Sequence, residues 1–498
     1  MSNQSILRIT RELSEIQKGS DLSIAVACRD IDVRHVRALI IGPPDTPYEF
    51  GFFEFAVKFT KDYPTKAPSV TAITTNGGRT RFNPNIYAAG KVCLSILGTW
   101  RGERGEEWSS AQGLESILIS IQSLMSSNPY ENEPGFEDAN SDFDKKNQAA
   151  YVDKIRHESL RISVVERLEE YLGIHQERPG VTVYNAEEDY KSGGEDAPFE
   201  PFKDLCKRRF LWYYPSYLAT IDEAATKHKD GDRFEKMPFE GPGNNMEGCY
   251  QYTALRERLV KIFEKLNDEM NGWATEGIVA VQKETGIASN LQRQFEQIVE
   301  NYRTDASVTL DLNLVDKNPF IWRLVLFGRP MTNLDGGMFT ILIHISPRFP
   351  DVLPRVKFAT PLFHHRVSPD GILCYDVARK DDMRSHIEAI IAAIEEESPA
   401  YDPRTLVNPE AARLFWGNPD QKKMYSRKLR RSVQDSAELT IAQKLLLSNA
   451  TAGRVTTLTA DYHILIHNNS DSSIPTLGHS MARIHGVPEV TGIASGCT

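Results

Sequence analysis

One stretch of this 498-residue sequence occurs twice, and that repeat limits the possible folds more than any other feature. When the chain is shifted against itself by 286 positions, turn residues match, as Gly42 and Gly328 do. The alternating apolar runs 53–59 and 339–345 match in phase, and no gap is needed over residues 9–74. Agreement of turns and strand phase over this length predicts two copies of one domain, because the unit is too long for a solenoid repeat.

The sequence pattern of the first copy predicts a helix, a sheet and further helices. Apolar residues at helical spacing predict an N-terminal helix over residues 6–16 and a later helix over 112–126. Apolar runs at 23–28, 36–41 and 53–59 predict strands of a sheet with one buried and one wetter face. The expected fold class is α+β: each copy has an N-terminal helix, an antiparallel four-stranded meander and C-terminal helices, and a helical linker joins the copies.

Four segments are expected along the chain. They are the first copy (1–175), a helical extension with linkers (176–286), the second, divergent copy (287–438) and a mostly flexible tail (439–498). Apolar stripes at 160–172 and 255–266 predict helices, and the polar, glycine-rich stretches 186–197 and 229–248 predict loops. The tail is expected to be flexible because it is rich in Ser, Thr, Asn and Gly.

Composition excludes several classes of protein. Apolar residues make up 40% of the chain and charged residues 25%, which is enough for packed cores. The 58 basic and 68 acidic residues leave a net charge of −10, which argues against nucleic-acid binding and leaves docking to a basic partner open. No apolar run would span a membrane, residues 1–13 lack an apolar signal-peptide core, and the six cysteines show no CxxC spacing. We expect an intracellular reducing compartment, cytoplasmic and/or nuclear, and no membrane or nucleic-acid partner.

Four motifs in the first copy follow one another in a fixed order. They are a turn and strand (42–53), a Tyr-Pro segment (63–68), the tripeptide Asn83-Pro84-Asn85, and Cys93, ten residues after Asn83. This order resembles the ubiquitin-conjugating enzymes, whose pattern is GPxxTPYxGGxF, YPxxPP, HPN and an active cysteine ten residues after the His. Asn83 stands in place of that His. The segments 98–100, 119–125 and 128–137 resemble the Z-type subfamily, shared with the conjugating domain of the giant inhibitor-of-apoptosis proteins.

The resemblance implies a function and its partners. Cys93 would carry ubiquitin or a ubiquitin-like protein as a thioester, and Asn85 would support the oxyanion. The modifier would come from an ATP-using activating enzyme and pass to lysines of substrate proteins with a ubiquitin ligase. The activating enzyme would dock on the N-terminal helix, where Arg8, Arg11 and Lys18 are expected to face outward. Because the chain has no Gly-rich phosphate loop, we expect no cofactor and no metal of its own.

The residue types around Cys93 suit acyl transfer independently of the resemblance. A thioester preserves most of the activation of an acyl group for later attack by an amine. An amide such as that of Asn85 can donate a hydrogen bond to the tetrahedral oxyanion. No His or Lys is directly adjacent in sequence to lower the pKa of the thiol, which favours an acyl carrier over a protease nucleophile. In the family's ligase-contact loop, Thr65 stands where an exposed aromatic residue is usual.

The second copy keeps a cysteine but changes its surroundings. The tripeptide becomes His364-His365-Arg366, and Cys374 again follows ten residues after the first His. Arg366 replaces the amide donor, and the neighbouring Asp376 should disfavour the thiolate. We therefore expect a degenerate domain that positions the first domain, its ligase or a second modifier, with Cys374 as a candidate second thioester site.

Several residue groups have competing interpretations. The competing function is a non-catalytic ubiquitin-binding scaffold of the conjugating fold. The basic clusters 207–209 and 427–431 are expected on solvated helix faces, with nuclear targeting as the alternative. Trp100 and Trp108 either pack or line the active-site rim. The two histidines and the cysteine of the second copy are too few for a zinc site. The remaining cysteines are expected to be structural or incidental: Cys28, Cys206, Cys249 and Cys497.

Overall fold

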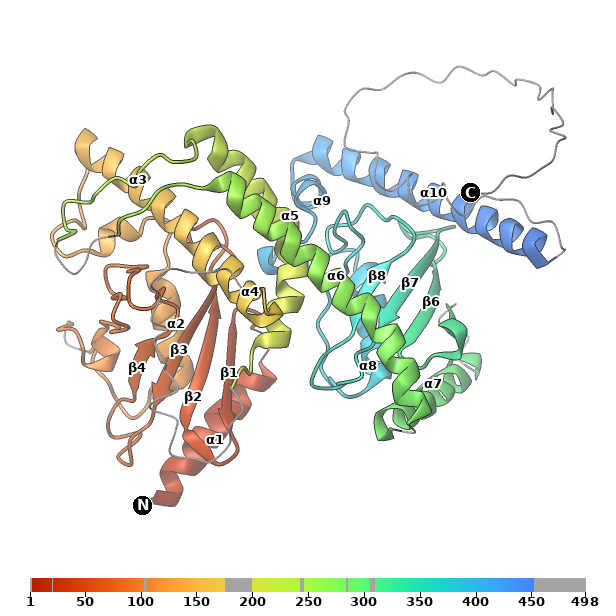
Figure 1. Ribbon diagram of the computed structural model, residues 1–498, viewed down its shortest axis with the longest axis horizontal. Coiled ribbons are helices and arrows are strands. Elements are labelled where there is room, and N and C mark those ends of the chain that lie inside the picture. Colours follow the sequence, from red (N-terminus) through yellow and green to blue (C-terminus); the bar gives the residue numbers. More distant parts are fainter. Residues whose placement is uncertain are drawn as a thin grey trace, which may run out of the picture. The chain divides into compact units, whose positions relative to one another are not determined.

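The computed structural model describes two antiparallel four-stranded sheets, one in each copy (Figure 1). The described residues are 2–19, 21–102, 105–174, 199–241, 246–283, 285–304 and 310–451, with side chains except at 2–3, 304 and 439–451. The predicted loop 186–197 and most of the predicted tail lie outside these ranges. Met1–Thr440 form one unit by their contacts.

The first copy has the predicted order of helix, meander and helices, with the strands in the order β1-β2-β3-β4. Its elements are α1 (Ser2–Lys18), β1 (Ile24–Arg29), β2 (Asp32–Ile41), β3 (Phe52–Lys58), β4 (Ser69–Ala72), α2 (Leu114–Leu124), α3 (Asp142–Glu158), a π-helical segment (Ser159–Glu166) and α4 (Arg167–Leu172). The sheet was predicted to have one buried and one wetter face, but apolar clusters cover both faces. Phe53 and Phe55 pack toward one apolar core, whereas Leu39 and Phe52 are buried in another cluster, with α4.

The second copy repeats this arrangement, with strands in the order β5-β6-β7-β8. Its elements are α7 (Gly286–Thr304), β5 (Leu310–Leu314), β6 (Ile321–Phe327), β7 (Met338–His344), β8 (Arg355–Phe358), α8 (Met383–Glu395), α9 (Pro409–Phe415) and α10 (Pro419–Thr451). Helix α10 continues past residue 438, where the second copy was expected to end.

The turn before the third strand is built the same way in both copies. A Cβ at Gly42 would lie 1.8 Å from the carbonyl oxygen of Tyr48, and one at Gly328 would lie 1.6 Å from that of Leu334. Only glycine allows such a close approach of the backbone. The predicted repetition of the fold is therefore confirmed down to this turn.

Two long helices, α5 (Lys203–Lys227) and α6 (Tyr252–Gln282), join the copies. They bury their apolar side chains in the apolar cluster that also covers the outer face of β2 and β3. Ile372, Cys374 and Val407 of the second copy belong to the same cluster, which we call the linker core. The linker is therefore part of the packed structure of both copies.

The basic cluster 207–209 was predicted to be solvated, and this prediction is wrong. Lys207 and Arg209 are buried in α5. The Lys207 ammonium pairs with Glu269 of α6 at 2.8 Å, and the Arg209 guanidinium lies 4.2 Å from the centre of the Trp212 ring. The ion pair offsets the cost of burying the Lys207 charge. The basic residues of 427–431, by contrast, are exposed on α10, as predicted.

The predicted loop 229–248 packs against the first copy where the structure describes it. Lys154 of α3 is fully buried, and its ammonium donates to the Glu240 carboxylate at 2.7 Å and to the Glu235 carbonyl at 2.8 Å. A buried ion pair of this kind fixes the loop, because separating the charges would leave one of them uncompensated. Within the described ranges, no helix is long and apolar enough to cross a membrane.

Candidate active site

Asn83 holds the tripeptide loop in place. Its side-chain amide donates to the carbonyl oxygen of Leu124 at 2.8 Å and to the phenol oxygen of Tyr48 at 3.2 Å. Its side-chain oxygen accepts a hydrogen bond from the backbone N–H of Asn85 at 2.9 Å. Because Asn83 is fully buried, these bonds tie the loop to the end of α2 without competition from water. An amide thus replaces the family His as an anchor of the loop.

Arg81 also supports this loop, and the motif analysis did not single it out. Its guanidinium donates to the carbonyl oxygen of Pro84 at 2.5 Å and to the Glu133 carboxylate at 3.0 Å. It lies 4.6 Å from the centre of the Tyr87 ring. A charge paired and stacked in this way stiffens the turn between Asn83 and Asn85. The signal available in the sequence was a basic residue directly before a Phe-Asn-Pro turn.

Cys93 is joined to Asn85 through the backbone. The N–H of Cys93 donates to the carbonyl oxygen of Asn85 at 2.8 Å, which brings the ends of the intervening loop together. Gly90 turns this loop at a φ of 89°, and a Cβ there would lie 2.8 Å from the carbonyl oxygen of Ala72. After Cys93, the Thr99 hydroxyl donates to the Val92 carbonyl oxygen at 2.7 Å. The cysteine therefore sits on a closed loop beside β4.

The side chain of Asn85 is half-buried. Among the described residues, its amide makes no hydrogen bond, whereas the Asn83 amide is fully engaged. An amide group that is held by the backbone but has no partner can donate to an oxygen that approaches Cys93. The two asparagines of the tripeptide thus have different environments, one suited to structure and one to chemistry.

The second copy keeps the same backbone geometry. The N–H of Cys374 donates to the carbonyl oxygen of Arg366 at 2.8 Å, and Arg366 N–H donates to Nδ1 of His364 at 3.2 Å. The Arg366 guanidinium is engaged with Glu396, at 3.5 Å. Arg366 thus stands in place of the amide donor, as predicted, and it forms an ion pair with Glu396.

Cys374 itself lies inside the linker core with side chains of α5. Its relative exposure is 1%, and burial raises the pKa of its thiol to about 12. The neighbouring Arg209 and Arg366 act in the opposite direction and do not offset burial, while Asp376 adds to the increase, as predicted. A thiol in this environment is protonated at neutral pH and is covered by the protein.

The residues expected at the active-site rim and in the ligase-contact loop differ in their exposure. Trp108 packs: its indole N–H donates to the Pro64 carbonyl oxygen at 2.8 Å, whereas Trp100 is about half exposed. Thr65 is exposed beside Pro64, as a contact loop requires. Trp100 is therefore exposed enough to line the active-site rim, whereas Trp108 packs against the segment of Pro64.

On α1, Arg11 and Lys18 are exposed, as predicted. The Arg8 side chain is 37% exposed and also has contacts within the first domain. Its guanidinium bonds to the Glu12 carboxylate and donates to the carbonyl oxygen of Gln112 at 3.2 Å. Arg8 therefore holds α1 against the segment that leads into α2.

His364 and His365 are stacked, with ring centroids 4.2 Å apart, and both are buried. Burial lowers the pKa of His364 to about 3 and that of His365 to about 2. Within the ranges that the structure describes, no three His, Cys, Asp or Glu side chains are grouped so that they could hold a metal ion.

Each copy has a four-stranded meander with the same turn and the same cysteine loop, which defines a pair of ubiquitin-conjugating-type domains. Comparison with known proteins agrees. A family model described as "Ubiquitin-conjugating enzyme" matches residues 8–159 and again residues 290–432. The chain belongs to the ubiquitin-conjugating enzyme family.

Individual relatives match part of the chain. "Ubiquitin-conjugating enzyme E2 Z" of Xenopus tropicalis is 38% identical over 268 residues, which cover 54% of this chain and 74% of that protein. The Homo sapiens protein of the same name is 38% identical over 270 residues, covering 53% and 66%. "Dual E2 ubiquitin-conjugating enzyme/E3 ubiquitin-protein ligase BIRC6" of Homo sapiens is 40% identical over 153 residues, covering 30% and 3%. These similarities confirm the resemblance that the motifs predicted.

Proposed function

We propose that this chain accepts ubiquitin or a ubiquitin-like protein as a thioester on Cys93 and transfers it to substrate lysines with a ubiquitin ligase. The observation that carries the proposal is the half-buried Asn85 amide, which makes no hydrogen bond among the described residues and stands on the closed loop in which the Cys93 N–H is held on the Asn85 carbonyl oxygen at 2.8 Å. That loop stands in a chain that belongs to the ubiquitin-conjugating enzyme family.

The proposed chemistry has two acyl-transfer steps. The Cys93 sulfur attacks the thioester carbonyl on the activating enzyme, a new thioester forms, and the thiol of the activating enzyme leaves. A lysine amine then attacks the Cys93 thioester, an amide bond forms, and the Cys93 thiol is released. Each step passes through a tetrahedral oxyanion, which the half-buried amide of Asn85 would stabilise in this proposal.

The proposed partners follow from this chemistry. The activating enzyme would spend ATP, so the chain itself needs no cofactor, and it would dock on the face of α1 that carries Arg11 and Lys18. A ligase would contact the exposed loop at Thr65. We place the protein in a reducing intracellular compartment, the cytoplasm or the nucleus, because a thiol that must accept an acyl group has to stay unoxidised.

A loading assay tests the proposal. The purified chain is mixed with ATP and a panel of activating enzymes, each with its own modifier, and products are separated with and without reductant. We expect an adduct with one pair that reductant removes. Cys93→Ser should trap the same modifier as an adduct that resists reductant, and Cys93→Ala should form none. Absence of any reducible adduct across the panel, with equal modifier binding by both variants, would favour the non-catalytic scaffold.

We propose further that the second domain does not carry a modifier. Both cysteines are buried, with relative exposures of 3% for Cys93 and 1% for Cys374. The cover of Cys374 by the linker core, the raised pKa of its thiol and the Arg366–Glu396 ion pair support this assignment. Cys374→Ala should therefore load at the wild-type level. A Cys93→Ala protein that still forms a reducible adduct, lost on a further Cys374→Ala change, would contradict the assignment.

A further inference from the structure

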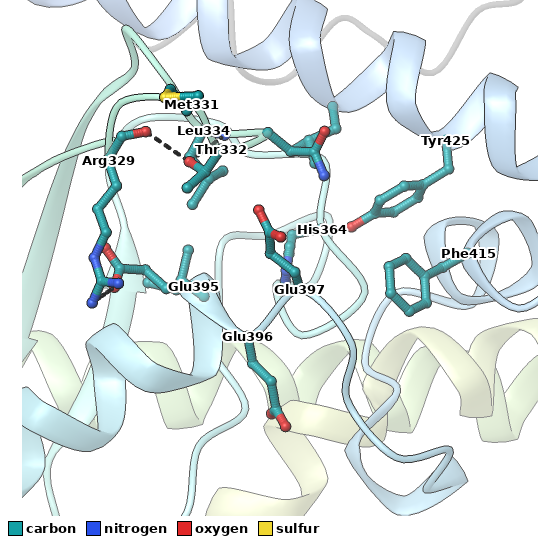
Figure 2. A pocket seen from close by; sticks show the side chains of 13 residues that line it. Arg329, Met331, Thr332, Leu334, His364, Glu395, Glu396, Glu397, Phe415 and Tyr425 are labelled. Atoms are coloured by element: carbon teal, nitrogen blue, oxygen red, sulfur yellow. Dashed lines mark hydrogen bonds and ion pairs between the residues drawn. The ribbon is translucent and has the colours of Figure 1, made fainter.

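The second domain contains a pocket of about 360 Å³ that no step of the proposed transfer uses (Figure 2). It lies where the loop between β6 and β7, the end of α8, and helices α9 and α10 meet. The residues that matter for its chemistry are Met331, Leu334, His364, Glu396, Glu397 and Tyr425.

A substitution between the two copies accounts for part of this space. Leu334 stands at the position that Tyr48 occupies in the first domain. Tyr48 is fully buried: its phenol donates to the Phe82 carbonyl oxygen at 2.7 Å, and its ring packs against Phe53 with centroids 5.7 Å apart. Leu334 has neither the ring nor the hydroxyl. The smaller Leu334 therefore leaves part of the space that the Tyr48 side chain fills in the first domain unfilled in the second domain.

The pocket combines apolar walls with negative charge. Leu334, Phe415 and other apolar side chains line its interior, and three carboxylates, Glu395 to Glu397, line its edge. Arg329 is paired with Glu395 at 2.7 Å and Arg366 with Glu396 at 3.5 Å, so among the described residues Glu397 is the carboxylate of this group without an ion pair. Figure 2 shows the Glu397 carboxylate directed into the pocket beside His364. The His364 ring adds no positive charge at neutral pH, because burial keeps it unprotonated.

Met331 at the rim of the pocket gives a second, independent indication of a contact surface. Its side chain is 97% exposed, and its φ is +66°. Asp45 has the equivalent position in the first domain with a φ of +59°, but aspartate tolerates the left-handed region far better than methionine does. A large apolar side chain that is fully exposed on a strained backbone is unfavourable in the isolated protein and favourable once a partner covers it.

We propose that this pocket receives an arginine side chain of a partner protein. The aliphatic part of the arginine would lie against the apolar walls, its guanidinium would bond to Glu397, and an apolar neighbour in the partner would cover Met331. Arginine suits the site because its planar fork can bond to one carboxylate through two N–H groups and can stack on rings such as those of Phe415 and Tyr425. The exposed Met331 favours a protein segment over a free amine, because a free amine would leave that side chain uncovered.

The test uses the full chain labelled with ¹³C at Met, Ile and Leu methyl groups. The probe is the blocked tripeptide N-acetyl-Leu-Arg-Leu-amide, and the control replaces its arginine with citrulline, which has a similar shape and no charge. We expect saturable shifts of the Met331, Leu334 and Ile394 methyls with the arginine peptide and at least tenfold weaker binding of the citrulline peptide. Equal binding of the two peptides, or no shift with either, would overturn the proposal.

Two variants and one deletion sharpen the test. Leu334→Tyr restores the first-domain residue and should abolish the shifts, and Glu397→Gln should weaken binding about tenfold while leaving the packing unchanged. Methyl spectra of first-domain residues report whether either variant remains folded. If both folded variants bind like the wild type, the pocket is not the site. If the peptide binds only after residues 452–498 have been removed, the chain's own segment is the occupant, and a partner is not.

Discussion

The phenol of Tyr213, on linker helix α5, donates a hydrogen bond to the carbonyl oxygen of Arg404 in the second domain at 3.0 Å. The ring of the same residue stacks on Phe50 of the first domain, with centroids 4.0 Å apart. One side chain of the linker therefore contacts both domains, in the same apolar cluster that holds Cys374. The burial of this second cysteine is a consequence of how the linker packs.

Cys374 should react slowly with alkylating reagents. With its thiol pKa raised from 9.0 to about 12, the thiolate fraction at pH 8 is about a thousandfold smaller than in an unfolded chain, and the cover of α5 adds to this protection. Iodoacetamide labelling followed by peptide mass spectrometry measures the rate in native and denatured protein. Tyr213→Ala should accelerate labelling of Cys374, whereas Tyr213→Phe, which keeps the ring, should change it little. Equal rates in native and denatured wild type would contradict the burial.

Asn85 and Asn83 should differ when each is changed to alanine. Asn85→Ala should load Cys93 almost normally but discharge to lysine about 10²- to 10³-fold more slowly, because an oxyanion donor is lost. Asn83→Ala should impair loading and discharge together and lower the melting temperature, because it removes the hydrogen bonds that hold the loop. Single-turnover assays on the charged protein separate the steps. If Asn85→Ala behaves like Asn83→Ala, Asn85 is a structural turn residue.

The second domain should lose stability in mild acid. His364 and His365 stay unprotonated when folded, with pKa values lowered to about 3 and 2, but protonate near pH 6.5 when unfolded. The unfolded state then binds more protons, so stability is complete above pH 6.5 and falls as the pH drops toward 3. For the pair, the loss approaches roughly 2 to 3 kcal/mol per pH unit.

Hydrogen exchange of β6 and β7 peptides, corrected for the intrinsic rate, measures this loss between pH 6.5 and 5.5, with β2 and β3 of the first domain as the internal reference. His365→Phe should reduce the dependence on pH without abolishing it, because burial also lowers the pKa values of His364, His344 and His386 in this domain. An identical response of the two domains would show that these histidines do not control it.

Charge reversal on α1 should affect loading alone. Arg11→Glu combined with Lys18→Glu should slow the loading of Cys93 about tenfold at low concentrations of activating enzyme, since exposed charges act mainly on association. Discharge from protein that is already loaded should be unchanged. Lys422→Glu combined with Lys423→Glu, at two exposed positions on α10, provides the matched control. If the control slows loading equally, the effect comes from net charge and not from α1.

Local sequence patterns were sufficient for the repeated fold and for the loop of Cys93. Gly42 and Gly328 mark turns that exclude any side chain, and the spacing from Asn83 to Cys93 reflects a loop closed on itself. Such features depend on residues that are close in sequence, so they can be read before the structure is known.

The burial of Lys207 and Cys374 could not be read in the same way. Each depends on a partner far along the chain: Glu269 for Lys207, and α5 for Cys374. A basic triplet looks the same in sequence whether water or a neighbouring helix surrounds it. The hydrogen bond of Arg8 could not be read from the sequence for the same reason, because its acceptor at Gln112 lies about a hundred residues away.

The linker core also has a consequence for the synthesis of the chain. Tyr213 leaves the ribosome about 160 residues before Cys374, which at typical elongation rates amounts to roughly 10 to 30 seconds. During that interval the apolar side chains of α5 that later meet the second domain have no cover. A nascent chain or a prematurely terminated product would expose them, and both are therefore expected to depend on chaperones in a way that the finished protein does not.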